Sequence, residues 1–180
     1  KYYPELSNEH VLVSEFVTGK TLEERILDED LPWEYLIELF RIHGAYMFGI
    51  GTFHGDLHPG NCLIDDDGDY VFIDNGAICQ APRGVSVPLF EFFEGLSKNQ
   101  LDEAFEALLG LAEERPSEDR VVRFKTRMSE IYQGFGEKSV GEQSLTDLMM
   151  KTVRTAVEDA GADFGEEAFP IIRSLMYMDG

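Results

Sequence analysis

The sequence predicts an α+β fold in one domain that is mainly α-helical and carries a small β-hairpin. Apolar residues recur at helical spacing through most of the chain after residue 33, whereas residues 62–73 contain two short β-prone runs around an aspartate-rich turn. The chain has 180 residues, of which 43% are hydrophobic and 12% aromatic, so it can bury a core. This composition excludes a disordered protein.

The longest predicted helix begins at Trp33, after Leu31-Pro32, and ends at Gly49-Ile50-Gly51. We expect this helix to be buried through its apolar residues, which are Trp33, Leu36, Ile37, Phe40, Ala45 and Phe48. Further helices are expected over residues 89–96, 101–111, 121–132, 145–157 and 169–178. Upstream of all of them, the apolar run 11–17 predicts a strand that reaches Gly19.

Three polar residues flank the predicted hairpin. The run His54-Gly55-Asp56-Leu57-His58-Pro59-Gly60-Asn61 precedes its first strand, and Asp74 follows its second. Because the ends of an antiparallel hairpin lie side by side, Asn61 and Asp74 can face one ion, and Asp56 can reach the same space. Oxygen ligands of this kind suit Mg²⁺. Phosphoryl transfer needs such a set, in which one carboxylate orients the incoming hydroxyl or water. We expect His54 and His58 to brace the loop.

The spacing of these residues resembles that of a known family. Asp56 and Asn61 are five residues apart, and Asn61 and Asp74 thirteen, as are the catalytic Asp, the catalytic-loop Asn and the metal-binding Asp of protein-kinase-like folds. The form H-G-D-L-H-P-G-N resembles the H-A-D-P-H-P-G-N motif of the UbiB (AarF/ADCK) family of atypical kinases. Residues 74–78 lead towards a helical region without an A-P-E segment, and residues 173–180 are similar to that family's closing helix.

The resemblance implies the C-terminal lobe of a protein-kinase-like fold, with ATP and Mg²⁺ as cofactors. In such a lobe Asp56 is the catalytic base or orienter, and Asn61 and Asp74 hold the metal. The resemblance also implies a kinase or ATPase linked to isoprenoid-quinone or lipid metabolism, including ubiquinone biosynthesis. A lipid or isoprenoid small molecule is then a partner, and the phosphoryl acceptor is unassigned.

Residues 11–19 resemble the hinge of such kinases, where an extended backbone pairs with the adenine edge. We expect Glu15, Phe16 and Val17 to make these contacts. Residues 1–19 then form a remnant strand and hinge, and residues 20–180 form the C-terminal lobe. No Gly-rich loop, strand Lys or K-x-G-Q motif precedes the hinge-like run, so we expect a fragment of a longer protein that is inactive without its upstream lobe.

Several alternatives stay open from the sequence. Aminoglycoside- and choline-kinase-like phosphotransferases carry a similar H-G-D-x-x-x-x-N loop. A pseudokinase-like scaffold that holds nucleotide without turnover is the second, because Asn75 replaces the Phe of D-F-G. The H-x-D-x-H run at 54–58 could bind a transition metal. Residues 55–58 also resemble the G-D-x-H block of metallophosphoesterases, although the later G-D and G-N-H blocks of that family are missing. Residues 65–69 mimic the start of an EF-hand, but Gly76 stands where Glu is needed, so we favour a solvated turn there.

The net charge of −20, from 35 acidic and 15 basic residues, argues against nucleic-acid binding. Cys62 and Cys79 form neither a disulfide framework nor a metal-ligand spacing, so we expect two buried thiols in a reducing compartment. The sequence has no signal peptide and no apolar run of about 18 residues, so we expect no membrane span. We expect a cytoplasmic location and leave peripheral membrane association open.

Overall fold

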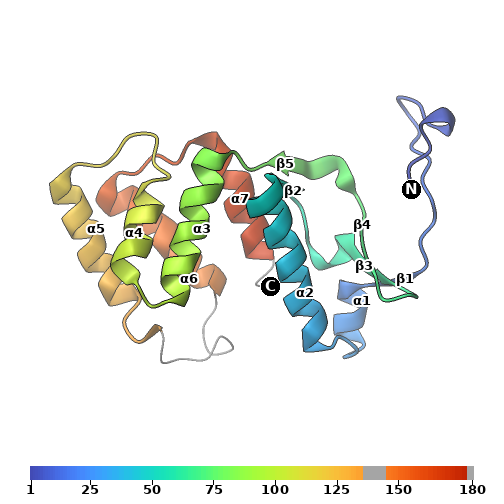
Figure 1. Ribbon diagram of the computed structural model, residues 1–180, viewed down its shortest axis with the longest axis horizontal. Coiled ribbons are helices and arrows are strands. Elements are labelled where there is room, and N and C mark those ends of the chain that lie inside the picture. The colour runs from blue at the N-terminus through green and yellow to red at the C-terminus, as the bar shows by residue number, and fades with distance from the viewer. Residues whose placement is uncertain (136–144, 178–180) are drawn as a thin grey trace.

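The computed structural model describes residues 1–135 and 145–177 and is mainly helical, with small sheets, as the sequence predicts (Figure 1). The α-helices are α1 (Leu22–Leu27), α2 (Trp33–Gly44), α3 (Arg83–Ser97), α4 (Leu101–Leu109), α5 (Glu118–Ile131), α6 (Leu145–Thr155) and α7 (Gly165–Tyr177). All the predicted helices are therefore present. Residue 178, where the last one was expected to end, lies outside the described residues.

Two small antiparallel sheets lie beside the helices. One contains β1 (Gly19–Thr21), β3 (Cys62–Asp65) and β4 (Tyr70–Phe72) in the order β1-β3-β4, and the other pairs β2 (Thr52–His54) with β5 (Ile78–Gln80). Cys62 lies opposite Phe72, so β3 and β4 form the predicted hairpin. Short 3₁₀ turns occupy η1 (Pro4–Leu6), η3 (Pro59–Asn61) and η4 (Asn75–Ala77).

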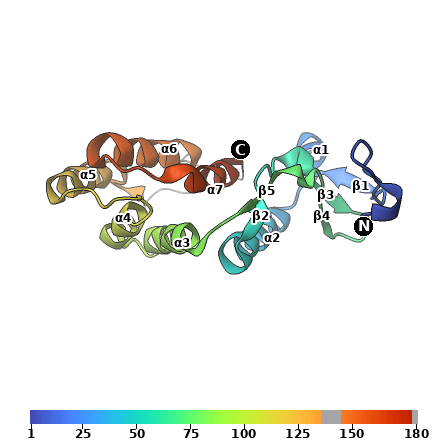
Figure 2. The same ribbon diagram turned by 90° about the horizontal axis from the view of Figure 1, so that it is seen from above.

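The elements divide into two groups, which Figure 2 shows side by side. Helices α3 to α7 pack together around the larger core, which includes Phe92, Phe105 and Phe124. The sheets lie with α1 and α2, where a smaller core forms from Leu22, Leu39, Leu57, Cys62 and Ile64. Helix α7 reaches the boundary between the groups and lies near β2 and β5 (Figures 1 and 2). Among the described residues, no helix is long and apolar enough to cross a membrane.

Helix α2 buries a different face from the predicted one. Trp33 is 63% exposed and Phe40 45% exposed, whereas Leu39, His43 and Met47 are buried. The helix continues into a π-helical turn, η2 (Ala45–Ile50), which ends at Gly51 in the left-handed conformation (φ 83°). Trp33 and Phe40 lie in the regular part of the helix, before this turn, so the helical period alone does not predict which side faces inward; that depends on the elements that pack against α2.

The predicted strand over residues 11–17 does not form. Its backbone makes a few bonds to the first residues, from Tyr3 N–H to the Val13 carbonyl (3.0 Å) and from Glu15 N–H to the Lys1 carbonyl (2.8 Å). Regular pairing begins only at Gly19. The prediction was wrong because this apolar run, within the described part of the chain, has no sheet face to pack on, and Phe16 is 89% exposed.

Candidate functional site

His54 braces the loop that follows β2, as the sequence predicts. Its ring Nδ1 accepts a hydrogen bond from Asp56 N–H (3.3 Å), and its Nε2 lies 2.9 Å from the Ile73 carbonyl oxygen. A carbonyl oxygen can only accept, so Nε2 carries the hydrogen and donates it. Both ring nitrogens of this buried side chain are thus engaged in holding the loop against the end of β4.

Asn61 links the two segments that carry the predicted site. Its side chain is 6% exposed, and its Nδ2 donates to the Asp56 carbonyl oxygen (3.0 Å). The backbone carbonyl oxygen of Asn61 accepts from the N–H of Ile73 (3.0 Å), the residue before Asp74. The side-chain amide is thus used as a donor, and neither bond involves Oδ1, the atom that a cation would bind.

Asp74 lies in an uncommon backbone conformation. Its φ of 51° and ψ of 53° place it in the left-handed region, directly before η4, and its side chain is exposed. An aspartate tolerates this conformation better than most residues, at a cost of about 1 kcal/mol. Asn75, at the position of the Phe in D-F-G, is also exposed and donates from Nδ2 to the Phe72 carbonyl (3.3 Å).

Gly55 allows the loop to approach β5 closely. Its N–H donates to the Ala77 carbonyl oxygen at 2.7 Å. A Cβ atom at this position would overlap Sγ of Cys79 and lie 2.8 Å from the Ala77 oxygen. An alanine at this position would therefore require Cys79 or the Ala77 carbonyl to shift.

Helix α7 contacts the same loop from its other side. Arg173 donates from an Nη atom to the Gly55 carbonyl (2.9 Å), and the fully buried Ser174 donates from Oγ to the His54 carbonyl (3.1 Å). Nε2 of His43 lies 3.0 Å from the same Oγ. Burial, with a smaller contribution from His54, lowers the pKa of His43 to about 4. Sequence reasoning missed these contacts, which join residues 118 to 131 positions apart.

Glu15, Phe16 and Val17, predicted to contact adenine, precede β1. Thr18 Oγ1 donates to Asp66 (2.6 Å), and Gly19 pairs with Asp65. These contacts bring the segment to the turn end of the hairpin, whereas Asn61 and Asp74 flank its other end. The structure thus brings the segments of Asp56, Asn61 and Asp74 together, and the adenine contact stays a prediction.

Comparison with known proteins identifies the family. The ABC1 atypical kinase-like domain matches residues 1–108, more than half of the chain. The chain belongs to the ABC1 atypical kinase-like family. The resemblance of its loop to the UbiB (AarF/ADCK) kinases is thereby confirmed, and two similar proteins of Arabidopsis thaliana carry such names.

The first of these relatives is the chloroplastic protein ACTIVITY OF BC1 COMPLEX KINASE 8, 26% identical over 125 residues, or 65% of this chain and 16% of the relative. The second is an uncharacterized aarF domain-containing chloroplastic kinase, 38% identical over 81 residues, or 42% and 10%. The RIO-type serine/threonine-protein kinase Rio2 of Methanocaldococcus jannaschii is 36% identical over 72 residues, or 37% and 26%. The ABC1 chain thus spans only 10–26% of the length of the curated relatives it matches.

The alternative metal sites find no support in the ABC1 chain. Among residues 1–135 and 145–177, no group of three His, Cys, Asp or Glu side chains is arranged to hold a metal ion. The two nitrogens of His54 serve the loop, which argues against the H-x-D-x-H alternative. Oδ1 of Asp65 accepts from the N–H groups of Asp67 (3.0 Å) and Asp69 (2.9 Å), so residues 65–69 form the expected hairpin turn.

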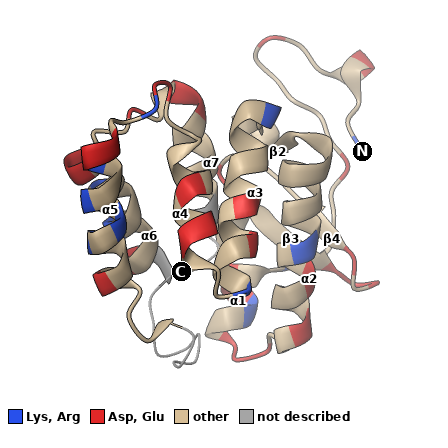
Figure 3. Cartoon of the chain, turned by 60° about the vertical axis from the view of Figure 1, so that its left-hand side comes forward, with Lys and Arg blue, Asp and Glu red and all other residues tan. Residues whose placement is uncertain are grey.

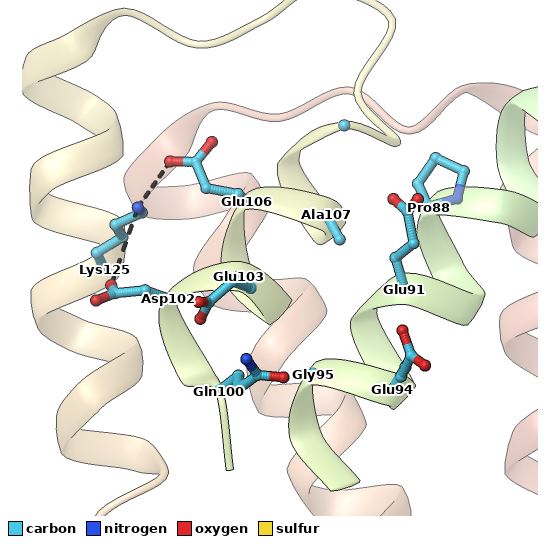
Figure 4. A pocket seen from close by; sticks show the side chains of 11 residues that line it. Pro88, Glu91, Glu94, Gly95, Gln100, Asp102, Glu103, Glu106, Ala107 and Lys125 are labelled. Atoms are coloured by element: carbon cyan, nitrogen blue, oxygen red, sulfur yellow. Dashed lines mark ion pairs between the residues drawn. The ribbon is translucent and has the colours of Figure 1, made fainter. Parts of the chain in front are cut away.

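A cavity of about 740 Å³ lies away from this loop, between α3, α4 and α5 (Figure 4). Its acidic lining residues are Glu91, Glu94, Asp102, Glu103 and Glu106. Lys125 of α5 lies 2.7 Å from Glu106, and Figure 3 shows the acidic segments of α3 and α4 together with the basic segments of α5. Like charges would repel a polyphosphate here, so the cavity does not suit a nucleotide.

Proposed function

We propose that residues 54–76 form the catalytic half of a phosphotransfer site, in an atypical kinase or ATPase that uses ATP and Mg²⁺. The family membership and the kinase names of the relatives support a kinase-like function. The observation that carries the proposal is the position of Asn61. Its side-chain amide donates to the backbone carbonyl of Asp56, and its backbone carbonyl accepts from the N–H of Ile73, the residue before Asp74.

Each residue has a defined role in the proposal. The Asp56 carboxylate orients the attacking hydroxyl or water and accepts its proton. Asn61 Oδ1 and the Asp74 carboxylate are hard oxygen donors, as Mg²⁺ requires, and they would hold it while water completes the shell. When bound, the metal neutralises charge on the nucleotide phosphates. Glu15, Phe16 and Val17 are proposed to meet the adenine.

The proposal also covers the domain and the substrate. Residues 20–180 would be the C-terminal lobe of a protein-kinase-like fold, a role that fits the helical body with its small hairpin. A cytoplasmic location is proposed from the free thiols of Cys62 and Cys79, which suit a reducing compartment. The link to isoprenoid-quinone or lipid metabolism rests on the family resemblance. The match to the ABC1 family supports an atypical kinase or ATPase over an aminoglycoside- or choline-kinase-like enzyme.

A pseudokinase-like scaffold is the second candidate, and one observation favours it. Asn75 is exposed and bonded back to Phe72, so no aromatic side chain at this position packs the segment that carries Asp74. Such a scaffold would bind nucleotide without turnover. The two candidates therefore differ in turnover, and they agree on the metal-binding role of Asn61 and Asp74.

The test uses the full-length protein and three Asp→Asn variants. We expect Asp74→Asn to abolish the Mg²⁺ dependence of ATP binding, and Asp56→Asn to reduce turnover by about 100-fold or more while ATP binding is kept. Asp67→Asn, in the exposed hairpin turn, is the matched control and should match the wild type. Unchanged Mg²⁺ dependence in Asp74→Asn would refute the metal site, and equal loss of binding and turnover in Asp56→Asn would make Asp56 structural. Wild-type binding without turnover would favour the scaffold.

A further inference from the structure

The peptide groups directly before Asp56 are held by side chains from distant parts of the chain. Residue 55 is a glycine, and Cys79 and the Ala77 carbonyl occupy the space that a Cβ atom would need there. A glycine has more backbone freedom than any other residue, so its conformation must be restricted by contacts from outside the loop. The direction of the Asp56 side chain depends on that conformation.

Helix α7 supplies two of these contacts. Arg173 donates to the carbonyl oxygen of Gly55 (2.9 Å), and Ser174 donates to that of His54 (3.1 Å). The two carbonyl groups are consecutive along the chain, so together they set the orientation of the peptide planes on both sides of the Gly55 Cα. The bond from Arg173 has a charged donor, which makes it stronger than a neutral hydrogen bond.

The direction of the hydrogen bonds at Ser174 follows from its single hydroxyl hydrogen. The His54 carbonyl can only accept, so the Ser174 hydroxyl donates to it. Ser174 Oγ therefore accepts from Nε2–H of His43 on α2. Both side chains are buried, and a chain of bonds from α2 through α7 thus ends on the loop. Buried networks in which every member is satisfied fix one arrangement of the groups they join.

We propose that Arg173 and Ser174 are positioning residues for Asp56, through which α7 holds the loop in the conformation that phosphoryl transfer requires. The catalytic consequence rests on the function proposed above, whereas the effect on the loop does not. Neither side chain needs to touch the nucleotide or the metal in this role. Loss of either contact should therefore affect the reaction rate more than nucleotide affinity.

Turnover and binding in the full-length protein test the catalytic consequence. We expect Arg173→Ala and Ser174→Ala each to lower kcat, by about 100-fold for Arg173→Ala, with the Kd for Mg-ATP unchanged. Arg173→Lys should restore part of kcat, because an ammonium group can still donate to the Gly55 carbonyl. Arg154→Ala, at an exposed position on α6, is the matched control and should keep wild-type kcat.

Hydrogen exchange tests the effect on the loop without reference to activity. In Arg173→Ala the backbone amides of Gly55 and Asp56 should exchange about 10-fold faster than in the wild type, while amides of α3 and α4 are unaffected. If these two amides exchange in Arg173→Ala at the wild-type rate, the proposal is overturned. It is also overturned if the wild type turns over ATP and Arg173→Ala has the same kcat. If the wild type shows no turnover, the function proposed above fails, and the exchange comparison still decides whether α7 positions the loop.

Discussion

Protonation of His43 should destabilise the fold in mild acid. This ring is 3% exposed, and burial lowers its pKa from 6.5 to about 4 in the folded chain, with a smaller contribution from the nearby His54. The unfolded chain therefore binds a proton at higher pH than the folded chain does. The folded state therefore has its full stability with respect to His43 above about pH 6.5, where the ring is neutral in both states, and loses stability as the pH falls from there towards about 4.

The size of the effect follows from the difference between the two pKa values. One pKa unit corresponds to about 1.4 kcal/mol, so the shift from 6.5 to about 4 corresponds to roughly 3 kcal/mol in total. Between about pH 7 and about pH 5, His43 should remove about 2 kcal/mol from the free energy of unfolding. This is a sizeable part of the typical stability of a domain, about 5–15 kcal/mol.

The assay is urea denaturation followed by circular dichroism at these two pH values. His43→Gln is the informative variant, because its amide nitrogen can still donate to Ser174 but does not titrate. The many carboxylates titrate alike in both proteins, so the difference between their pH dependences isolates His43. We expect the wild type to lose about 2 kcal/mol more than His43→Gln. His10→Gln, at an exposed position, should behave as the wild type. Equal losses in the wild type and His43→Gln would refute the reasoning.

Two further predictions concern packing and charge. Gly55→Ala should lower the free energy of unfolding by about 1–3 kcal/mol, because the new Cβ overlaps Cys79. Cys79→Ala in the same chain should recover part of this loss. Urea denaturation measures both, and equal stability of Gly55→Ala and the wild type would contradict this packing. Lys125→Ala should raise the pKa of Glu106, since the hydrogen bond from Lys125 is the main cause of its lowered value. NMR titration of the carboxyl groups measures this change, with Lys98→Ala as the control. An unchanged Glu106 pKa in Lys125→Ala would contradict the prediction.

Local sequence patterns were sufficient for much of the secondary structure. The aspartate-rich turn at 65–69 lies between two β-prone runs, and the structure has the hairpin there. The helices from α3 to α7 were all predicted, because their apolar spacing and the breaks between them are properties of neighbouring residues. The motif around Asp56 likewise led to the family, which the ABC1 match confirms.

The exposed runs show where local patterns fail. Residues 11–17 have the composition of a buried strand, yet Phe16 is 89% exposed. Trp33 and Phe40 follow a helical period, but α2 buries Leu39 and His43, and η2 buries Met47. Whether an apolar side chain is buried depends on which elements pack against it, and no local pattern contains that information.

The sequence by itself determined the family, the helices from α2 to α7, the hairpin and the candidate residues Asp56, Asn61 and Asp74, because each of these depends on residues close together in the chain. Only the tertiary structure decided how the loop at Asp56 is held. The contacts of Arg173 and Ser174 with this loop span about 120 residues, and the space around Gly55 is filled from β5. Such contacts arise from the packing of distant elements, so they become visible only once the chain is folded.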